Sequence, residues 1–560
     1  MNKFSSENIR RTIQNPLFGS SLSCLFFIII VLVFITPIFE TNDDASFMLM
    51  LSGKVLSGTP EPQVYFINIV LSTILASLYR LAPDFQWYGY FHLIILFICV
   101  WAISFSVLSR RMSVATYSLL GFFLLNVFMV NLLFLQFTRT AYIAGQAGIL
   151  LAIIIFSESK VQTSKTFPFL VISGFLLLIS LTLRIESFAL AILLNIPILF
   201  FLKIDKKKIR SMLVFSTTFI LLATTLWLTH QYHYNQNGWG KFSELNKAKS
   251  SFNEDRWSKI DANQNILNKI GWSKNDFYFL WNWGYVNKKI FSKEKIIHFA
   301  KLNKTFPGED TPLSYKFKLF KDSVLKYDQT WWIALTLLPI IIISGRQNWK
   351  PVLFFLLLTL ITLVAILVWM KLPSRIFYPV FTGVFIMSLI SAGTEPFFKN
   401  SKLGLTTSSV CLSLLLFLFI IFNTPQKLAR QSREIQNINK SFRLNLKALS
   451  PKKEQTFIVW GGGFPYELIL PLEEKSYLET FKVFSIGVLN QSPFQLKKMK
   501  EMGIEDPFLA ALNNKNIFLS LKPWTKPLLK KYLYEHYRII TNLQPHFSSN
   551  FFTFYEVHSP

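Results

Sequence analysis

The sequence predicts an α-helical polytopic membrane protein with about 11 transmembrane helices, further helices on the outer membrane surface, and a C-terminal soluble α/β domain. Three observations support this fold class. The 560 residues are 51% hydrophobic and only 16% charged, a balance typical of a chain dissolved in a bilayer. Almost uncharged runs, each long enough to span the hydrocarbon as a helix of about 20 residues, recur from Phe18 to Asn423. Beyond Asn423 the composition becomes that of a soluble domain.

The formal net charge of +27 does not indicate a nucleic-acid-binding protein. Lysine and arginine lie mostly in short loops and in the C-terminal part, where basic clusters report membrane topology and contact with anionic lipid. The three cysteines, Cys24, Cys99 and Cys411, all lie in apolar runs. The chain therefore offers neither a disulfide framework nor a Cys-rich metal site.

The first apolar run, Phe18 to Phe39, is interpreted as a retained transmembrane helix. It follows Lys3, Arg10 and Arg11 as a signal peptide would, but it is long and ends without a small-residue cleavage site. The other predicted spans are residues 88–108, 114–136, 141–157, 167–183, 187–202, 211–229, 331–345, 351–370, 376–394 and 404–423.

One further apolar run, Val64 to Ala82, is predicted to lie along the outer membrane surface. Pro60, Pro62 and Pro83 bracket it, and counting charges decides its placement. If it crossed the membrane, five basic clusters would face outward, against the positive-inside rule: Arg110/Arg111, Lys160/Lys165, Lys203 to Arg210, Arg346/Lys350 and Lys399/Lys402. As an interfacial helix it leaves these clusters and the N-terminus in the cytoplasm and the C-terminus outside.

This topology divides the chain into a transmembrane domain, residues 1–423, and an extracytoplasmic α/β domain, residues 424–560. Within the first, the segment 40–87 carries the outer surface helices, and the tryptophan-rich loop 230–330 is too long to be a mere connector. In the second, strands are predicted at 456–460, 481–486 and 517–521, and helices at 427–449, 493–502 and 526–537.

Two adjacent carboxylates follow the first helix in Glu40-Thr-Asn-Asp-Asp44. Asp43 and Asp44 are candidates for a general base or for ligands to a cation. An equally good interpretation is that Asn42 caps the next helix and both aspartates lie in its first turn, where the helix dipole favours negative charge.

Each of three short outer turns carries an arginine, although positive charge is not expected there. Arg139 lies in Gln136-Phe-Thr-Arg-Thr140, Arg184 precedes Ile-Glu186, and Arg375 ends Lys371-Leu-Pro-Ser-Arg375. Together with Glu186 and Lys371, these residues are candidates for binding an anion, because the guanidinium fork matches phosphate oxygens. The alternative for each arginine is contact with lipid headgroups or pairing with a local acid such as Glu186.

The order of these features resembles the GT-C superfamily of membrane glycosyltransferases. A spanning helix leads into an acidic pair, a surface helix, the segment Pro60-Glu-Pro-Gln-Val-Tyr-Phe-Ile-Asn68, and a helix that ends at Arg110-Arg111. Within the superfamily the organisation is similar to that of aminoarabinose transferases and protein O-mannosyltransferases, over about residues 18–160. The acidic residue that the family carries in the next outer turn is absent here, where Arg139 stands instead.

The resemblance implies an inverting transferase that moves a sugar from a polyprenyl-phosphate-linked donor to an extracytoplasmic glycan, lipid or protein acceptor. By position, Asp43 or Asp44 is the catalytic base, and the arginines stabilise the leaving lipid phosphate. The need for a divalent cation, Mg²⁺ or Mn²⁺, is left open. The implied location is the bacterial inner membrane, with the active site outside. The alternatives are a transporter or flippase for lipid-linked glycans, or a polymerase that joins them.

Overall fold

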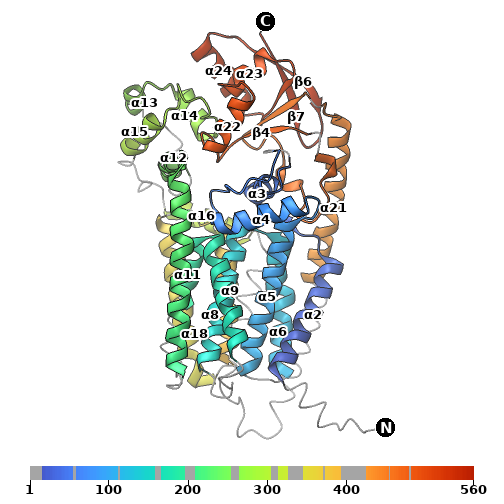
Figure 1. Ribbon diagram of the computed structural model, residues 1–560, viewed down its shortest axis with the longest axis vertical. Coiled ribbons are helices and arrows are strands. Elements are labelled where there is room, and N and C mark those ends of the chain that lie inside the picture. Colours follow the sequence, from blue (N-terminus) through green and yellow to red (C-terminus); the bar gives the residue numbers. More distant parts are fainter. Residues whose placement is uncertain are drawn as a thin grey trace.

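The computed structural model describes residues 15–54, 58–110, 114–157, 166–195, 208–253, 264–303, 313–325, 345–369, 372–392, 424–452, 454–478 and 481–559. These residues form an elongated molecule, with a bundle of long helices at one end and a mixed α/β region at the other (Figure 1). We call the end of the bundle that faces the α/β region its upper end.

Four described helices are long and apolar enough to cross a membrane: α2 (Pro16–Phe34), α5 (Trp87–Arg110), α8 (Phe137–Ser157) and α11 (Ile209–Asn235). Other apolar helices at predicted spans include α9 (Phe167–Leu183), α10 (Ile185–Asn195), α18 (Gly345–Trp369) and α19 (Ser374–Ala392). The predicted span 114–136 is a continuous run of α6 (Val114–Phe123), a π-helical turn (Leu124–Phe128) and α7 (Met129–Leu133). The predicted spans at 331–345 and 404–423 lie outside the described residues, apart from Gly345.

Helix α8 is the core of the bundle, and its side chains are almost all buried. Gly145 and Gly148 let α9 approach closely, since a Cβ atom at Gly145 would meet the Ser180 Oγ at 2.6 Å. Two serines of α9 donate hydrogen bonds to the α8 backbone, Ser173 to the Gly148 carbonyl and Ser180 to the Ala141 carbonyl. Small residues at such contacts are typical of helices that pack inside a membrane.

Helices α3 (Asn42–Ser52) and α4 (Ile69–Leu81) lie across the upper end of the bundle, not alongside its helices (Figure 1). The 13 residues of α4 extend for only ~20 Å at about 1.5 Å per residue, short of the ~30 Å hydrocarbon core. Asn68 caps α4 by accepting from the Val70 N–H, and Arg80 in its last turn donates to the Pro60 carbonyl. Helix α4 is thus shorter than the hydrocarbon core is thick, and the placement of this segment on the outer membrane surface stays a prediction.

The C-terminal region contains a five-stranded sheet in the order β4-β3-β5-β7-β6. Strands β3 (Thr456–Trp460), β4 (Val483–Ile486) and β5 (Ile517–Ser520) are parallel, while β7 (Thr553–His558) is antiparallel to β5 and β6 (Asn542–Ser548). Helices α21 (Thr424–Leu449), α22 (Pro493–Glu501) and α24 (Thr525–Tyr537) match the predicted ones. The α/β character is therefore confirmed, whereas β6, β7 and α23 (Pro507–Asn513) were not predicted.

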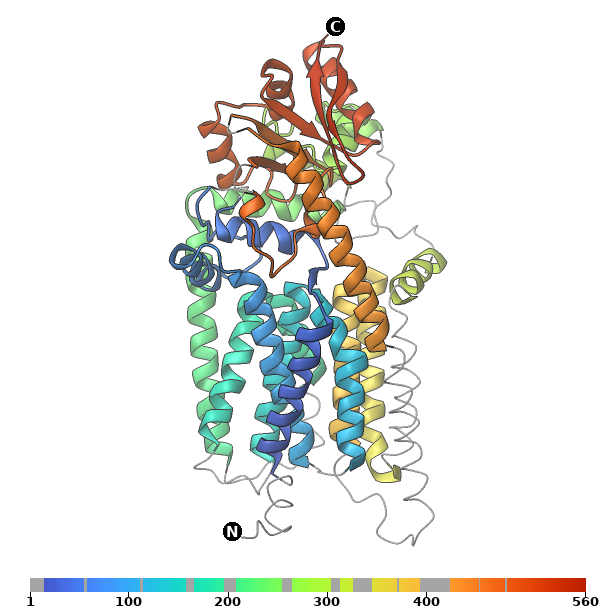
Figure 2. The ribbon, with the colours of Figure 1, turned by 90° about the vertical axis from the view of Figure 1, so that its right-hand side faces the viewer.

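The long loop packs onto this sheet and shares its core. The loop forms helices α12 (Trp239–Asn253), α13 (Gln264–Ile270), α14 (Lys274–Trp281), α15 (Lys293–Asn303) and α16 (Leu313–Leu325). Phe279 stacks on Tyr532, with ring centroids 4.3 Å apart, and contacts Trp460 of β3. Figure 2 shows the green helices of this loop beside the red C-terminal elements above the bundle, whereas the yellow-green α16 lies apart from them, beside the upper end of the bundle. Helices α12 to α15 therefore share a hydrophobic core with the sheet, although they are far from it in sequence.

Candidate active site

The predicted acidic and basic residues meet at the upper end of the bundle, beneath the C-terminal region. The starts of α3, α8 and α19 meet there, since Asp44 of α3 accepts from the Phe137 N–H of α8 and Asp43 of α3 lies near Arg375 of α19. A short parallel pairing of β1 (Ile38–Phe39) with β2 (Phe134–Leu135) draws the end of α2 toward the start of α8. The backbone N–H of Glu40 continues this pairing by donating to the Leu135 carbonyl at 3.0 Å.

Asp44 is completely buried and joins three segments of the chain. Its Oδ1 accepts from the Tyr88 hydroxyl at 2.9 Å and from the Phe137 N–H at 3.0 Å. Its Oδ2 lies 3.0 Å from the Thr41 hydroxyl. Because Phe137 is the first residue of α8, the carboxyl group satisfies an N–H that α8 itself leaves unpaired. Asp44 thus links the starts of α3, α5 and α8.

Burial raises the pKa of Asp44 to about 8, and the nearby Asp43 charge adds to this rise. The hydrogen bonds from Tyr88, Phe137 and Thr41 act in the opposite direction but do not cancel the effect of burial. A carboxyl group in this state carries a proton at neutral pH, and it has no exposed surface for a substrate.

Asp43, by contrast, is accessible. Its side chain is 42% exposed, and its Oδ2 lies 4.0 Å from the Nη1 of Arg375, which is 39% exposed. Asp43 is in the first turn of α3 and Arg375 in the first turn of α19. The two aspartates were equivalent candidates by sequence, but they differ in the structure. Asp44 is a buried hydrogen-bond acceptor, and Asp43 is an exposed carboxylate beside a guanidinium.

Arg139 lies in a buried ion pair with Glu40, a residue that the sequence analysis did not select. The Nε of Arg139 is 2.6 Å from Oε2 of Glu40, and its Nη2 donates to Oε1 at 2.8 Å. Both side chains are buried, and the Ser374 hydroxyl also donates to Glu40 Oε1 at 2.8 Å. Since Ser374 precedes Arg375, this pair fixes the start of α19 against the start of α8. A carboxylate immediately preceding Thr-Asn-Asp was the available signal for Glu40.

Arg184 connects α9 to α10 and is 26% exposed. Its Nε pairs with Glu186 at 2.8 Å, the local pairing that was one of the two sequence interpretations. Its guanidinium also lies over the rings of Phe66 and Phe137, 5.2 Å and 5.7 Å from their centroids. Because Phe137 also donates its N–H to Asp44, Arg184 belongs to the same cluster of helix starts. The fourth candidate cation, Lys371, lies outside the described residues.

The C-terminal region closes directly over this cluster. The Glu467 N–H donates to the Asn42 side chain at 3.0 Å, next to Asp43. Lys475 is buried and donates to the Gln86 side chain at 2.6 Å, just before α5. A Cβ atom at Gly89 would meet the Pro471 carbonyl oxygen at 2.3 Å, so only glycine permits this approach. The segment 466–475 therefore holds the α/β region against α3 and α5.

The acidic pair does not fit a shared divalent cation. Asp44 already takes three hydrogen bonds from its neighbours. Asp43 lies within ion-pair distance of a guanidinium, whose charge opposes that of a metal ion. Divalent cations with oxygen ligands usually need several carboxylate or carbonyl groups in one place.

The solved structures that are similar to this chain include two of the aminoarabinose transferase ArnT from Cupriavidus metallidurans. One is bound to undecaprenyl phosphate and the other is in the apo state. Each is 10% identical, with a TM-score of 0.40; they cover 96% and 95% of this chain, and the match spans 97% of each ArnT chain. No family model and no curated protein matches the sequence.

Proposed function

We propose that this protein is an integral membrane glycosyltransferase that moves a sugar from a polyprenyl-phosphate-linked donor to a hydroxyl acceptor. The observation that carries the proposal is the accessible Asp43 carboxylate, 4.0 Å from the Arg375 guanidinium at the end of an apolar helix bundle. A carboxylate that takes a proton and a cation that receives a phosphate are the two groups that such a transfer requires.

In the proposed reaction, Asp43 takes the proton of the acceptor hydroxyl as its oxygen attacks the anomeric carbon. The bond from that carbon to the lipid phosphate breaks on the opposite side, so the configuration inverts. The phosphate oxygen that leaves with the electron pair gains negative charge. Arg375 and Arg184 are both partly exposed and can approach it.

Arg139 has a supporting role in this proposal. Its guanidinium is 1% exposed and engaged with Glu40, so a phosphate would have to displace a buried carboxylate to bind it. The pair instead fixes Ser374, and through it the neighbouring Arg375. Glu186, which is largely exposed, would compete with phosphate for Arg184 and leave it when the donor binds.

The position of the site supports a donor that arrives through the lipid. Helix α4 is amphipathic and lies across the bundle end, as interfacial helices do. The proposed compartment is the extracytoplasmic side, because the positive-inside rule then keeps Arg110, at the end of α5 far from the C-terminal region, in the cytoplasm. No nucleotide sugar is available on that side, and a lipid-linked one is.

The test is release of undecaprenyl phosphate by the purified full-length protein, with individual undecaprenyl-phosphate-linked sugars as donors and bacterial membrane extract as acceptor. Asp43→Asn should lower the rate by about 10²- to 10⁴-fold, the usual contribution of general base catalysis. Asp84→Asn is the matched control, because Asp84 is an exposed acid that pairs with a neighbouring cation, Lys54.

Full release by Asp43→Asn would eliminate Asp43 as the base. Movement of the lipid-linked sugar from one leaflet of a vesicle membrane to the other, without any release of undecaprenyl phosphate, would instead support a flippase. Arg375→Ala should weaken binding of undecaprenyl phosphate itself, which separates loss of the phosphate site from loss of the base.

A further inference from the structure

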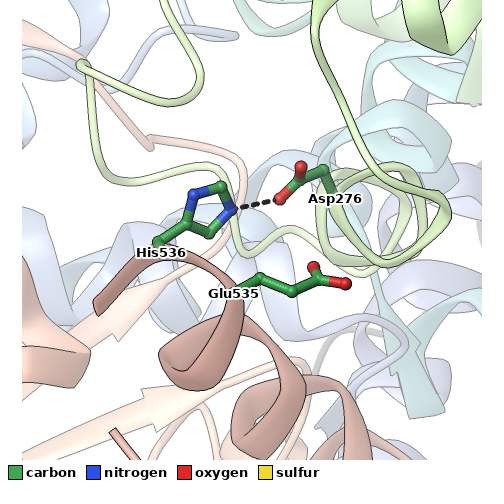
Figure 3. Close-up of side chains that lie close together, drawn as sticks. All are labelled: Asp276, Glu535 and His536. Carbon is green, nitrogen blue, oxygen red and sulfur yellow. Dashed lines mark hydrogen bonds and ion pairs between the residues drawn. The ribbon is translucent and has the colours of Figure 1, made fainter. Parts of the chain in front are cut away.

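A second group of ionisable side chains lies far from the helix starts, between the long loop and the C-terminal region. Asp276 comes from α14, and Glu535 and His536 come from the last turn of α24 (Figure 3). One potential ligand atom from each residue lies within 4.8 Å of the others. The three side chains converge from elements about 260 residues apart in sequence.

The fold holds Asp276 in a fixed orientation. Ser273 and Asp276 form a reciprocal capping box at the start of α14, in which Asp276 Oδ2 accepts from the Ser273 N–H at 2.9 Å. This leaves Oδ1 directed at the His536 Nε2, 2.7 Å away. Asp276 is 2% exposed, so its carboxylate is removed from water.

Glu535 is oriented by the same serine. The Ser273 hydroxyl donates to Glu535 Oε2 at 2.8 Å, and Lys531 lies 3.6 Å from Oε1. One serine thus positions two carboxylates, as residues behind the ligands do in metal sites. Glu535 and His536 are each about one-quarter exposed, which leaves a route for an ion from solvent.

We propose that Asp276, Glu535 and His536 bind a divalent cation of the zinc class. One imidazole and two carboxylates are a ligand set that zinc accepts, with water in the fourth position. Zinc–ligand bonds of about 2.0–2.2 Å require ligand atoms ~3.3–3.6 Å apart in a tetrahedron. The contact between Asp276 and His536 must therefore open slightly and Glu535 must approach, movements within the reach of side-chain rotation.

The ion would join the long loop to the C-terminal region. Helices α14 and α24 already pack through Phe279 and Tyr532, and the Asn275 side chain donates to the Leu528 carbonyl. A bound cation would add a cross-link at the solvent-facing end of this contact. This role is structural, and it does not depend on the glycosyltransferase proposal.

The test uses full-length protein in detergent, carrying a tag without histidine, treated with EDTA and then desalted. Zinc content after re-addition and desalting, the visible absorption of added Co²⁺, and the thermal unfolding midpoint are measured. Wild type should retain one Zn²⁺ per chain and unfold at a higher temperature with it. His536→Ala should bind at least about tenfold more weakly and lose the stabilisation.

The matched control is His298→Ala, which removes an exposed histidine from α15 of the same loop. It should retain the ion and the stabilisation. Glu535→Ala provides a second test if His536→Ala fails to fold. Equal zinc retention by wild type and either folded variant would overturn the proposal, and so would equal stabilisation by Mg²⁺, which prefers all-oxygen octahedral ligands.

Discussion

Replacing Asp44 tests whether its hydrogen bonds to Tyr88 and Phe137 stabilise the packing of the starts of α3, α5 and α8. Asp44→Ala removes the acceptor of the Tyr88 hydroxyl and the Phe137 N–H, both of which are buried. Asp44→Asn keeps that acceptor, because an amide oxygen can replace Oδ1. Its NH₂ group takes the place of Oδ2 beside the Thr41 hydroxyl, which can rotate to accept instead of donate.

The magnitude follows from the two buried donors. Each one left without an acceptor costs about 1–3 kcal/mol, so Asp44→Ala should lower the free energy of unfolding by about 2–6 kcal/mol. The Thr41 hydroxyl adds little, because it can rotate toward another acceptor or water. Asp44→Asn should cost far less at mildly acidic pH, where the wild-type carboxyl group is protonated.

The pH dependence has a definite sign. The pKa of Asp44 is about 8 in the folded protein and near its ordinary value of 3.8 when unfolded. Between these values the folded state holds a proton that the unfolded state lacks, so the contribution of Asp44 to stability falls as pH rises. As pH rises, the free energy of unfolding of Asp44→Asn should increase relative to that of wild type by up to about 1.4 kcal/mol per pH unit.

Thermal unfolding of wild type, Asp44→Asn and Asp44→Ala in one detergent, at a fixed scan rate and at several values between about pH 5 and pH 8, measures these effects. Alanine should be less stable than asparagine at every pH, because only asparagine keeps the acceptor of the two buried donors. The advantage of asparagine should grow as pH rises. A constant difference between asparagine and wild type across this range would refute the account of Asp44 as a protonated internal acceptor.

Two further predictions concern other buried charges. Removing one partner of the Glu40–Arg139 pair, by Glu40→Gln or Arg139→Met, should lower stability by about 3–5 kcal/mol, because it leaves the other charge buried without compensation. The double variant should be less destabilised than the sum of the singles; additive effects in thermal or denaturant unfolding would contradict the pairing. Burial also lowers the pKa of Lys475 to about 7. The unfolded chain therefore holds a proton on this lysine, up to about pH 10, that the folded chain releases, and stability should rise with pH above 7. Lys475→Met should lack this rise. If the unfolding free energies of wild type and variant changed in parallel with pH, the lowered pKa of Lys475 would be excluded as the cause.

The membrane part of the fold was predictable because its signals are local. A spanning helix satisfies its own backbone hydrogen bonds, so length and apolarity reveal it. Helix α9 begins and ends at the predicted residues, Phe167 and Leu183. The predicted surface placement of α4 rests on charge bias, a property of the whole chain that needs no knowledge of packing.

The C-terminal sheet was predictable in its buried parallel part only. Strands β3 and β5 are continuous apolar runs whose side chains are almost all buried, and such runs stand out in a sequence. Strand β6 is mostly exposed and contains Pro545, so its pattern argued against a strand. The proline is tolerated because β6 lies at the edge of the sheet.

The partnership between the long loop and the sheet was not predictable from either segment. Phe279 and Tyr532 are separated by more than 250 residues, and no local pattern specifies their contact. Trp239 and Trp272 of the same loop are both buried. Tryptophan enrichment in the loop indicated a core, and composition alone does not distinguish a core from a binding surface.

The sequence indicated where the candidate site lies. It did not indicate which charged residues there are buried in ion pairs and which are accessible to a substrate. Three arginines in short turns were equivalent by charge counting, yet Arg139 is sealed against Glu40 while Arg375 and Arg184 reach the surface. The difference arises because the β1–β2 pairing brings Glu40 to the start of α8, and strand register is invisible in a two-residue strand. A buried ion pair is rigid because breaking it is costly, whereas an accessible one can exchange its partner for a phosphate. In the proposed reaction, the buried charges would hold the helix starts in place while the exposed charges beside them change partners.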